Sequence, residues 1–115
     1  MRNQSIVLVF KSDGMGLSAN QALRENLARK FLLLLDEANT LPAAICFMTD
    51  GVRLCCEGSP LLEPLALLET KRVPLVICKT CVDAFGIADK VRVGVVGGMT
   101  DIITAMWSAD KVIDL

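Results

Sequence analysis

Short apolar runs alternate along this chain with longer segments in which apolar residues recur at helical spacing. Runs of about 4 to 8 mostly apolar residues indicate buried strands, whereas longer segments with a period near 3.6 indicate helices. The predicted strands are Ser5–Lys11, Ala43–Met48, Val73–Cys78, Val91–Val96 and Lys111–Asp114. The predicted helices are Ala19–Ala38, Pro60–Lys71, Val82–Ile87 and Met99–Ser108, and Val52–Gly58 fits either a short strand or a helical turn.

This alternation predicts a single α/β domain over residues 1–115. A strand reaches a parallel neighbour through a crossover that usually carries a helix, so alternating strands and helices favour a mostly parallel sheet. We therefore expect a sheet of about five strands with helices on both of its faces. The chain shows no internal repeat, low-complexity tract or linker.

The first predicted helix is apolar around most of its circumference. Ser18 and Gln21 have the spacing of a capping box, so we expect the helix to begin directly after Ser18. The stripe expected to pack on the sheet is Leu23, Leu27, Phe31, Leu34 and Ala38. Leu32, Leu33 and Leu35 widen the apolar surface beyond the single arc that packing on a sheet requires. These additional leucines predict contact with a second subunit.

Composition and charge narrow the classes of function. Apolar residues make up 53% of the chain, a surplus that favours burial between the subunits of a homo-oligomer. A net charge of −1 and only 4% aromatic residues argue against a nucleic-acid partner. No apolar run approaches the roughly 18 residues that span a bilayer, and the first run is too short for a signal peptide. We therefore expect a cytoplasmic protein without a membrane partner, in which the cysteines are reduced.

Three loops follow the first three predicted strands and should meet at one edge of the sheet, where α/β proteins bind ligands. They read SDGMGLS, TDG and CKTC. The candidate substrate-binding residues in the first two loops are Asp13, Gly14, Met15, Gly16, Asp50 and Gly51. SDGMGLS is interpreted first as a tight turn that needs positive φ. The alternative is a loop that binds an anion or a small substrate through free N–H groups at the start of the helix.

The Cys-x-x-Cys spacing of Cys78 and Cys81 is the strongest chemical signal in the chain. If Cys78 ends a strand and Cys81 opens a helix, the helix dipole and the neighbouring Lys79 favour the thiolate, which is the nucleophilic form. Lys79 therefore joins the candidate substrate-binding residues. The alternative is that both cysteines are small, half-buried side chains at the end of a strand.

The other three cysteines do not predict a metal site. Structural zinc usually takes four Cys or His ligands, and the chain has no histidine. Cys55 and Cys56 are adjacent, so in a strand their side chains would point to opposite faces. Cys46 is expected in the core, and one of Cys55 and Cys56 is a candidate for exposure at the rim of the site. We expect neither a metal nor a cofactor.

Four segments resemble the DsrE/DsrF-like family, small α/β subunits of sulfur-relay systems. They are SDGMG, FMTDGVRLCCEGS, VPLVICKTCVDAFGI and GGMTDIITAMWSADKVIDL, and they extend over nearly the whole chain. The resemblance is greatest to the C-terminal domain of the YedF-type proteins, which are sulfurtransferase-like and linked to selenium metabolism. It implies a flavodoxin-like sheet and assembly as a trimer or a hexamer.

The resemblance also implies roles for the two cysteines of CKTC. In sulfur-carrying members, a cysteine at the end of this strand, eight residues before a glycine, receives a persulfide sulfur. Cys78 has that position relative to Gly86, and Cys81 matches a second cysteine that many relatives have. Phe85 stands where several members have an arginine. The implied partners are sulfur donor and acceptor proteins, such as a TusA-like protein or a cysteine desulfurase.

The sequence supports three hypotheses of function. The first is an intracellular carrier of persulfide sulfur, or of selenium, that acts through Cys78 and Cys81; whether it is a sulfurtransferase-like enzyme stays open. The second is a non-catalytic oligomeric subunit that binds a small anion or a nucleotide at the sheet edge. Thiol pKa values at or above the ordinary one for both Cys78 and Cys81 would favour this second hypothesis. The third is a dithiol oxidoreductase with a stable Cys78–Cys81 disulfide.

Overall fold

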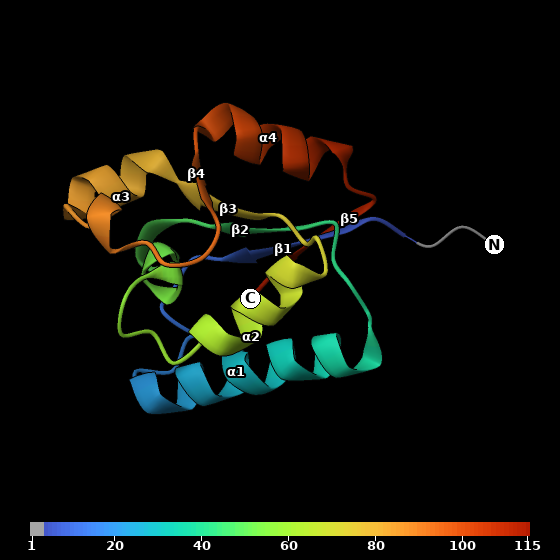
Figure 1. The fold of residues 1–115 in the computed structure, drawn as a ribbon, viewed down its shortest axis with the longest axis horizontal. Helices are drawn as coiled ribbons and strands as arrows, with labels where there is room; N and C mark the ends of the chain where they lie inside the picture. Colours follow the sequence, from blue (N-terminus) through green and yellow to red (C-terminus); the bar gives the residue numbers. More distant parts are fainter. Residues whose placement is uncertain (1–3) are drawn as a thin grey trace.

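A computed structural model describes residues 4–115 and contains one parallel sheet of five strands in the order β4-β3-β2-β1-β5. The strands are β1 Ile6–Phe10, β2 Ala44–Phe47, β3 Leu75–Cys78, β4 Val95–Gly97 and β5 Lys111–Asp114. Figure 1 shows the sheet running through the middle of the molecule between two layers of helices. The predicted single-domain α/β fold with a parallel sheet is confirmed.

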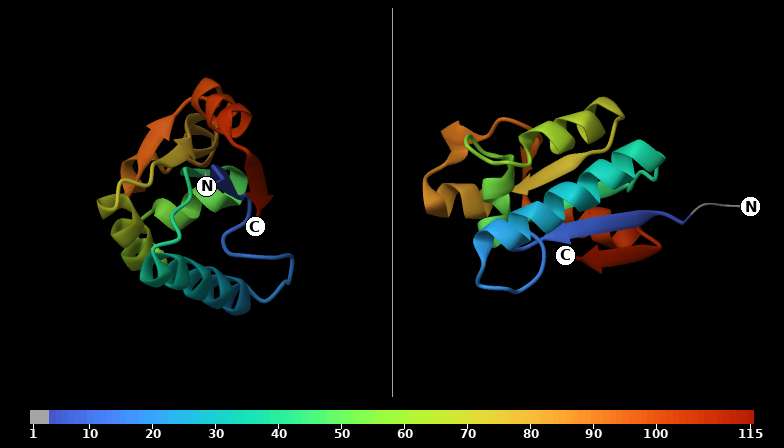
Figure 2. Two further views of the ribbon diagram at one scale, coloured as in Figure 1. Left: turned by 90° about the vertical axis from the view of Figure 1, so that its right-hand side faces the viewer. Right: turned by 90° about the horizontal axis from the view of Figure 1, so that it is seen from below.

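The direction of the strand crossovers explains where the long helices lie. The crossovers from β1 to β4 step in one direction, whereas β5 returns to the free side of β1 and pairs Val112 with Val7. Because such crossovers are right-handed, a reversal of direction puts the connecting helix on the opposite face of the sheet. Helices α1 (Gln21–Ala38) and α2 (Leu62–Thr70) accordingly cover one face, and α4 (Met99–Ser108) covers the other (Figures 1 and 2).

Three short helices complete the fold. The 3₁₀ helix η1 (Thr49–Cys55) follows β2, α3 (Lys79–Phe85) follows β3 directly, and the 3₁₀ helix η2 (Ala88–Lys90) comes after α3. Both η1 and α3 therefore start at the carboxyl edge of the sheet, where the sequence predicted that its candidate loops would meet. The ambiguous segment Val52–Gly58 is thus mostly helical, and Val91 is paired with Cys56 in an isolated bridge rather than belonging to β4.

Helix α1 packs on the sheet through a stripe different from the predicted one. Ala28 and Leu32 are buried, whereas Leu23, Leu27 and Leu34 are exposed. The assignment of Leu23, Leu27 and Leu34 to the sheet and of Leu32 to a partner subunit was wrong. Apolar residues surround this helix, so their period does not identify the buried arc; the small Ala28 lets that side lie close to the sheet.

The start of α1 also differs from the prediction. Asn20 is the N-cap, and its side-chain oxygen accepts a hydrogen bond of 3.1 Å from the backbone N–H of Leu23. Ser18 instead accepts a hydrogen bond from the backbone N–H of Asn20. The capping box predicted for Ser18 and Gln21 was therefore wrong, and Pro60 similarly lies before the first residue of α2 rather than in its first turn.

Much apolar surface stays outside the core. On α4, the side chains of Met99, Ile103 and Trp107 are exposed at a spacing of four residues, so they form one stripe along the helix. Trp107 is 87% exposed, and Val95 on the neighbouring edge strand β4 is 71% exposed. We call these four residues the α4 patch. Within residues 4–115, none of the helices is both long enough and apolar enough to cross a bilayer.

Candidate functional site

The two cysteines of CKTC lie at the junction of β3 and α3. Cys78 is the last residue of β3 and the N-cap of α3, and Cys81 lies in the first turn of that helix. The helix was predicted to begin at Val82, so its true start at Lys79 brings Cys81 inside it. Cys78 is only 1% exposed, whereas Cys81 is half-buried. Cys81 is thus the thiol of the pair that a solute or a partner protein can reach.

The contacts of Cys81 set its protonation state. Burial raises the pKa of the Cys81 thiol, and a hydrogen bond with the Cys78 side chain raises it further. The backbone N–H of Thr49 lies 3.2 Å from Cys81 Sγ and acts on this pKa in the opposite direction. The net pKa of Cys81 lies above the ordinary value, so the resting thiol is protonated at neutral pH.

Lys79 was expected to favour the thiolate, and the structure pairs it with a carboxylate instead. Its ammonium bonds to Asp83 Oδ2, one turn further along α3, and both side chains are largely exposed. Such an exposed pair on one helix contributes little to stability. Asp83 is therefore the partner of Lys79.

The SDGMG loop is held against α1. Asp13 Oδ1 accepts a hydrogen bond of 2.6 Å from Arg24 Nη2 in a partly buried ion pair. Gly14 is packed so tightly that a Cβ atom there would lie 2.5 Å from Arg24 Cβ. The carboxylate of Asp13 is thus already used within the fold, and Gly14 is required by the close approach of the loop to the helix. Gly16 has the positive φ expected of a tight turn.

Met15 and Gly16 line a separate hollow beside the end of β5. This hollow has a volume of about 460 Å³ and is bordered by Lys11 and Asp114, whose side chains form an ion pair of 2.6 Å. It lies at the carboxyl ends of β1 and β5, which is the point where the strand order reverses direction. Open α/β sheets commonly bind ligands at such a point.

The TDG turn after β2 consists of Thr49, Asp50 and Gly51, and the sequence did not indicate a role for Thr49. Asp50 is exposed and pairs with Arg53 at 3.4 Å. Gly51 is buried, and a Cβ atom there would lie 2.2 Å from the carbonyl oxygen of Phe10, so the turn packs directly on the end of β1. The residue of this turn that contacts Cys81 is Thr49, whose backbone N–H donates a hydrogen bond to its sulfur. Since a backbone group makes the contact, no side-chain pattern in the sequence indicates it.

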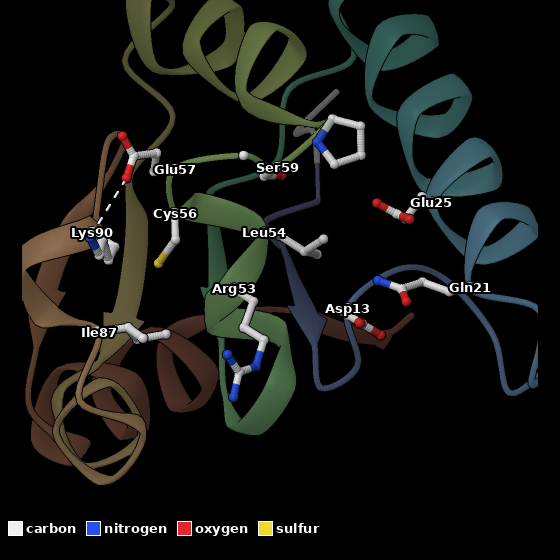
Figure 3. Close-up of a pocket in the computed structure, with 12 residues that line it drawn as sticks. Asp13, Gln21, Glu25, Arg53, Leu54, Cys56, Glu57, Ser59, Ile87 and Lys90 are labelled. Carbon is white, nitrogen blue, oxygen red and sulfur yellow. Dashed lines mark ion pairs between the residues drawn. The ribbon is translucent and has the colours of Figure 1, made fainter.

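A second hollow, of about 360 Å³, lies between α1 and η1. Figure 3 shows Asp13, Gln21 and Glu25 on one side of it and Cys56, Ile87 and Lys90 on the other. Cys55 and Cys56 are both buried, so the expectation that one of them is exposed at the rim was wrong. Burial raises the pKa of the Cys56 thiol, although Arg53 and Arg92 oppose this change. Cys46 is buried in β2, as predicted.

Arg53 links this hollow to α3. Its guanidinium carbon lies 4.3 Å from the centroid of the Phe85 ring, within the range of a cation–π interaction. Several members of the family that the sequence resembles have an arginine at the position of Phe85. In this chain the arginine comes from η1 instead, and its side chain packs on the ring of Phe85.

The candidate residues thus fall into separate groups at one edge of the sheet. Cys78, Cys81 and Thr49 form the thiol site. Asp13 and Arg53 line the hollow of Figure 3, and Met15 and Gly16 line the hollow beside β5. The sequence predicted the shared edge correctly, but the two hollows that residues of the SDGMG loop line within residues 4–115 include neither Cys78 nor Cys81.

Comparison with known proteins supports the resemblance noted from the sequence. No curated protein matches the chain. Among solved structures, the crystal structure of the ychN protein from E. coli has a TM-score of 0.73 and 25% sequence identity to this chain. The alignment covers 98% of this chain and 100% of that chain. Because the model of one family also matches residues 4–115, the chain belongs to the DsrE/DsrF-like family, which is associated with sulfur relay.

Proposed function

We propose that this protein carries sulfur as a persulfide on the Cys78–Cys81 pair. The observation that carries the proposal is the position of Cys81, a half-buried thiol in the first turn of α3 with a second thiol hydrogen-bonded to it. Membership of a family associated with sulfur relay supports the same chemistry. The resemblance alone would assign the first step to Cys78, but exposure favours Cys81 as the thiol that meets a donor.

The transfer requires no external oxidant. The Cys81 thiol loses its proton to solvent, and the thiolate attacks the terminal sulfur of a donor persulfide. One S–S bond forms at Cys81 while the S–S bond of the donor breaks, and the donor leaves as a thiolate. An acceptor thiolate then attacks the terminal sulfur on Cys81 and releases the Cys81 thiolate. Selenium would follow the same steps, as the resemblance to the YedF-type proteins suggests.

Cys78 is assigned a second role. The Cys78 thiol is buried directly behind Cys81, so a donor protein does not easily reach it. It is, however, close enough to attack the inner sulfur of a persulfide on Cys81. Attack there forms a Cys78–Cys81 disulfide and releases the terminal sulfur as hydrosulfide, with electrons balanced. Return to the dithiol then requires a cellular thiol reductant, as expected for a protein of the cytoplasm.

A homo-oligomer is part of this proposal. The α4 patch presents an exposed tryptophan and three apolar side chains, and large exposed apolar patches mark interaction surfaces. If the α4 patch of one protomer packs on the α4 patch of a second copy, both patches are buried and no other partner is needed. The patch begins at β4, whose Gly97 pairs with Cys78, so assembly would bring the second copy near the thiol site.

Replacing Trp107 by glutamate tests this interface. A buried interface tryptophan commonly contributes 2 kcal/mol or more, so Trp107→Glu should weaken association by about 30-fold or more. Light scattering coupled to gel filtration over a range of concentrations measures the change. Leu67→Glu is the matched control, because Leu67 is an exposed apolar residue on α2, on the other face of the sheet. An unchanged mass for Trp107→Glu would contradict the role of the α4 patch.

Mass spectrometry tests the carrier function directly. The purified protein is incubated with a cysteine desulfurase and free cysteine, and sulfur addition that a reductant reverses is the expected result. Trypsin cuts after Arg72, Lys79 and Lys90, so it separates Cys78 and Cys81 into residues 73–79 and 80–90. We expect the added sulfur on 80–90. Because Cys78→Ser cannot form the disulfide, a disulfide in the wild-type protein together with no sulfur gain on residues 80–90 of Cys78→Ser would favour the dithiol oxidoreductase instead.

A second candidate function is the binding of a small anion or nucleotide by an oligomeric subunit with inert cysteines. The raised pKa of Cys81 favours it, since an activated carrier thiol more often has a lowered one. The hollows lined by Asp13 and by Met15 and Gly16 offer it space. A folded protein that takes up no sulfur while both thiols titrate would favour this candidate over the carrier.

A further inference from the structure

Thr49 has a backbone conformation that its residue type disfavours. Within residues 4–115, three residues other than glycine have positive φ: Asn39, Thr49 and Arg72. Asn39 caps the end of α1 and Arg72 follows the end of α2, positions where a left-handed residue commonly terminates a helix. Thr49, with φ 48°, follows a strand and is β-branched, which makes positive φ costly. Such strain persists where the surrounding structure holds it, and it is concentrated at functional sites.

The hydroxyl of Thr49 is placed where it can hold this conformation. Its hydroxyl lies within hydrogen-bond distance of two carbonyl oxygens, that of Lys11 after β1 and that of Met48 after β2, the latter at 2.8 Å. Thr49 therefore joins the carboxyl ends of two adjacent strands. On its other side Gly51 is packed against the carbonyl of Phe10, so the turn is fixed at both ends.

The result of this conformation is that the Thr49 N–H points at the thiol site. Its nitrogen lies 3.2 Å from Cys81 Sγ, and a sulfur that carries negative charge accepts such a bond more strongly than a neutral thiol does. Two other neighbours of Cys81 do not add to this stabilisation, because the hydrogen bond with Cys78 raises the pKa of Cys81 and the ammonium of Lys79 is bound to Asp83.

We infer that Thr49 is a positioning residue of the thiol site, which holds its own backbone N–H against the Cys81 sulfur through the hydrogen bond that its hydroxyl donates to the carbonyl oxygen of Lys11 or of Met48. The N–H stabilises the negative charge that Cys81 carries whenever it acts as a nucleophile or is released as a leaving group. This inference deepens the proposed function, because sulfur transfer passes through that thiolate twice. The stabilisation itself is a property of the fold and does not depend on the identity of the donor.

The pH dependence of Cys81 alkylation tests this role. Removing the hydroxyl in Thr49→Val leaves a β-branched residue without the side-chain hydrogen bond that offsets the cost of positive φ, so we expect the N–H to turn away and the thiolate to lose a charge-assisted hydrogen bond. The pKa of Cys81 should then rise. At a fixed pH below that pKa, the rate of alkylation by iodoacetamide should fall by roughly threefold to tenfold. The rate is followed on the tryptic peptide 80–90, which contains no other cysteine.

Three further variants complete the experiment. Thr49→Ser keeps the hydroxyl and should retain the wild-type pH profile. Thr49→Ala removes the hydroxyl without a β-branch, so it replaces Thr49→Val if that variant fails to fold, with the same expected direction. Thr70→Val is the matched control, because Thr70 also donates its hydroxyl to a backbone carbonyl but lies at the end of α2, towards the amino edge of the sheet.

The possible results separate this inference from the carrier proposal. Folded Thr49→Val and Thr49→Ala proteins with the wild-type alkylation profile would overturn the positioning role, even if the wild-type protein takes up sulfur. A shifted profile in a protein that takes up no sulfur would uphold the positioning role and refute the carrier. If Thr49→Ser shifts the profile as far as Thr49→Val does, the hydroxyl is not the holding group and the inference fails.

Discussion

Cys81→Ser is expected to abolish sulfur uptake, with a loss of at least about 100-fold relative to the wild-type protein, because an unactivated hydroxyl is a far weaker nucleophile than a thiolate. Serine is close to cysteine in size, and its oxygen still accepts the hydrogen bond that the Thr49 N–H now makes to sulfur. The fold should therefore be retained. Intact-protein mass spectrometry after incubation with the desulfurase and cysteine measures the loss.

Two other cysteine variants show whether the loss is specific to Cys81. Cys78→Ser should still take up sulfur on residues 80–90, but it cannot form the disulfide that releases hydrosulfide. Cys56→Ser is the matched control: Cys56 is buried, and the new hydroxyl can donate to the Val52 carbonyl as the thiol does. Wild-type uptake by Cys81→Ser, mapped to residues 73–79, would transfer the receiving role to Cys78.

The second large effect concerns stability. Gly51→Ala should lower the free energy of unfolding by about 3 kcal/mol or more, because its Cβ would lie 2.2 Å from the carbonyl oxygen of Phe10 and 2.7 Å from its carbon. Both atoms belong to the backbone of a buried strand, so neither can move without disturbing the sheet. Urea denaturation followed by far-UV circular dichroism measures the change.

Gly98→Ala is the control for this substitution. Gly98 precedes α4, has φ −80°, and a Cβ there would meet only Thr100 Oγ1 at the ordinary contact distance of 3.7 Å. We expect its free energy of unfolding to stay within about 0.5 kcal/mol of the wild-type value, as for most substitutions away from tight packing. If Gly51→Ala is equally mild, the TDG turn does not pack closely on β1. The turn would then not be fixed at the end that follows Thr49.

The candidate residues show how differently sequence signals translate into a site. The CKTC pair was placed correctly, because a short apolar run followed by a helix puts its junction at the carboxyl edge of a parallel sheet. Asp13, Gly14 and Gly51 were also at this edge, yet Asp13 pairs with Arg24 and the two glycines are required by close packing. Polar residues and glycines in an edge loop serve packing or ligand binding equally well, and the sequence does not separate the two uses.

What the sequence determined by itself is the local structure: five strands, the long helices, the last strand with its correct bounds, and a thiol pair at a strand end. Each of these depends on the period and length of apolar segments, which neighbouring residues specify. Tertiary structure alone decided that β5 returns to β1, that α1 buries Ala28 and Leu32 rather than Leu23 and Leu27, and that the Thr49 amide meets Cys81. These features depend on contacts between residues distant along the chain, and a local pattern is compatible with several such contacts until the whole core is packed.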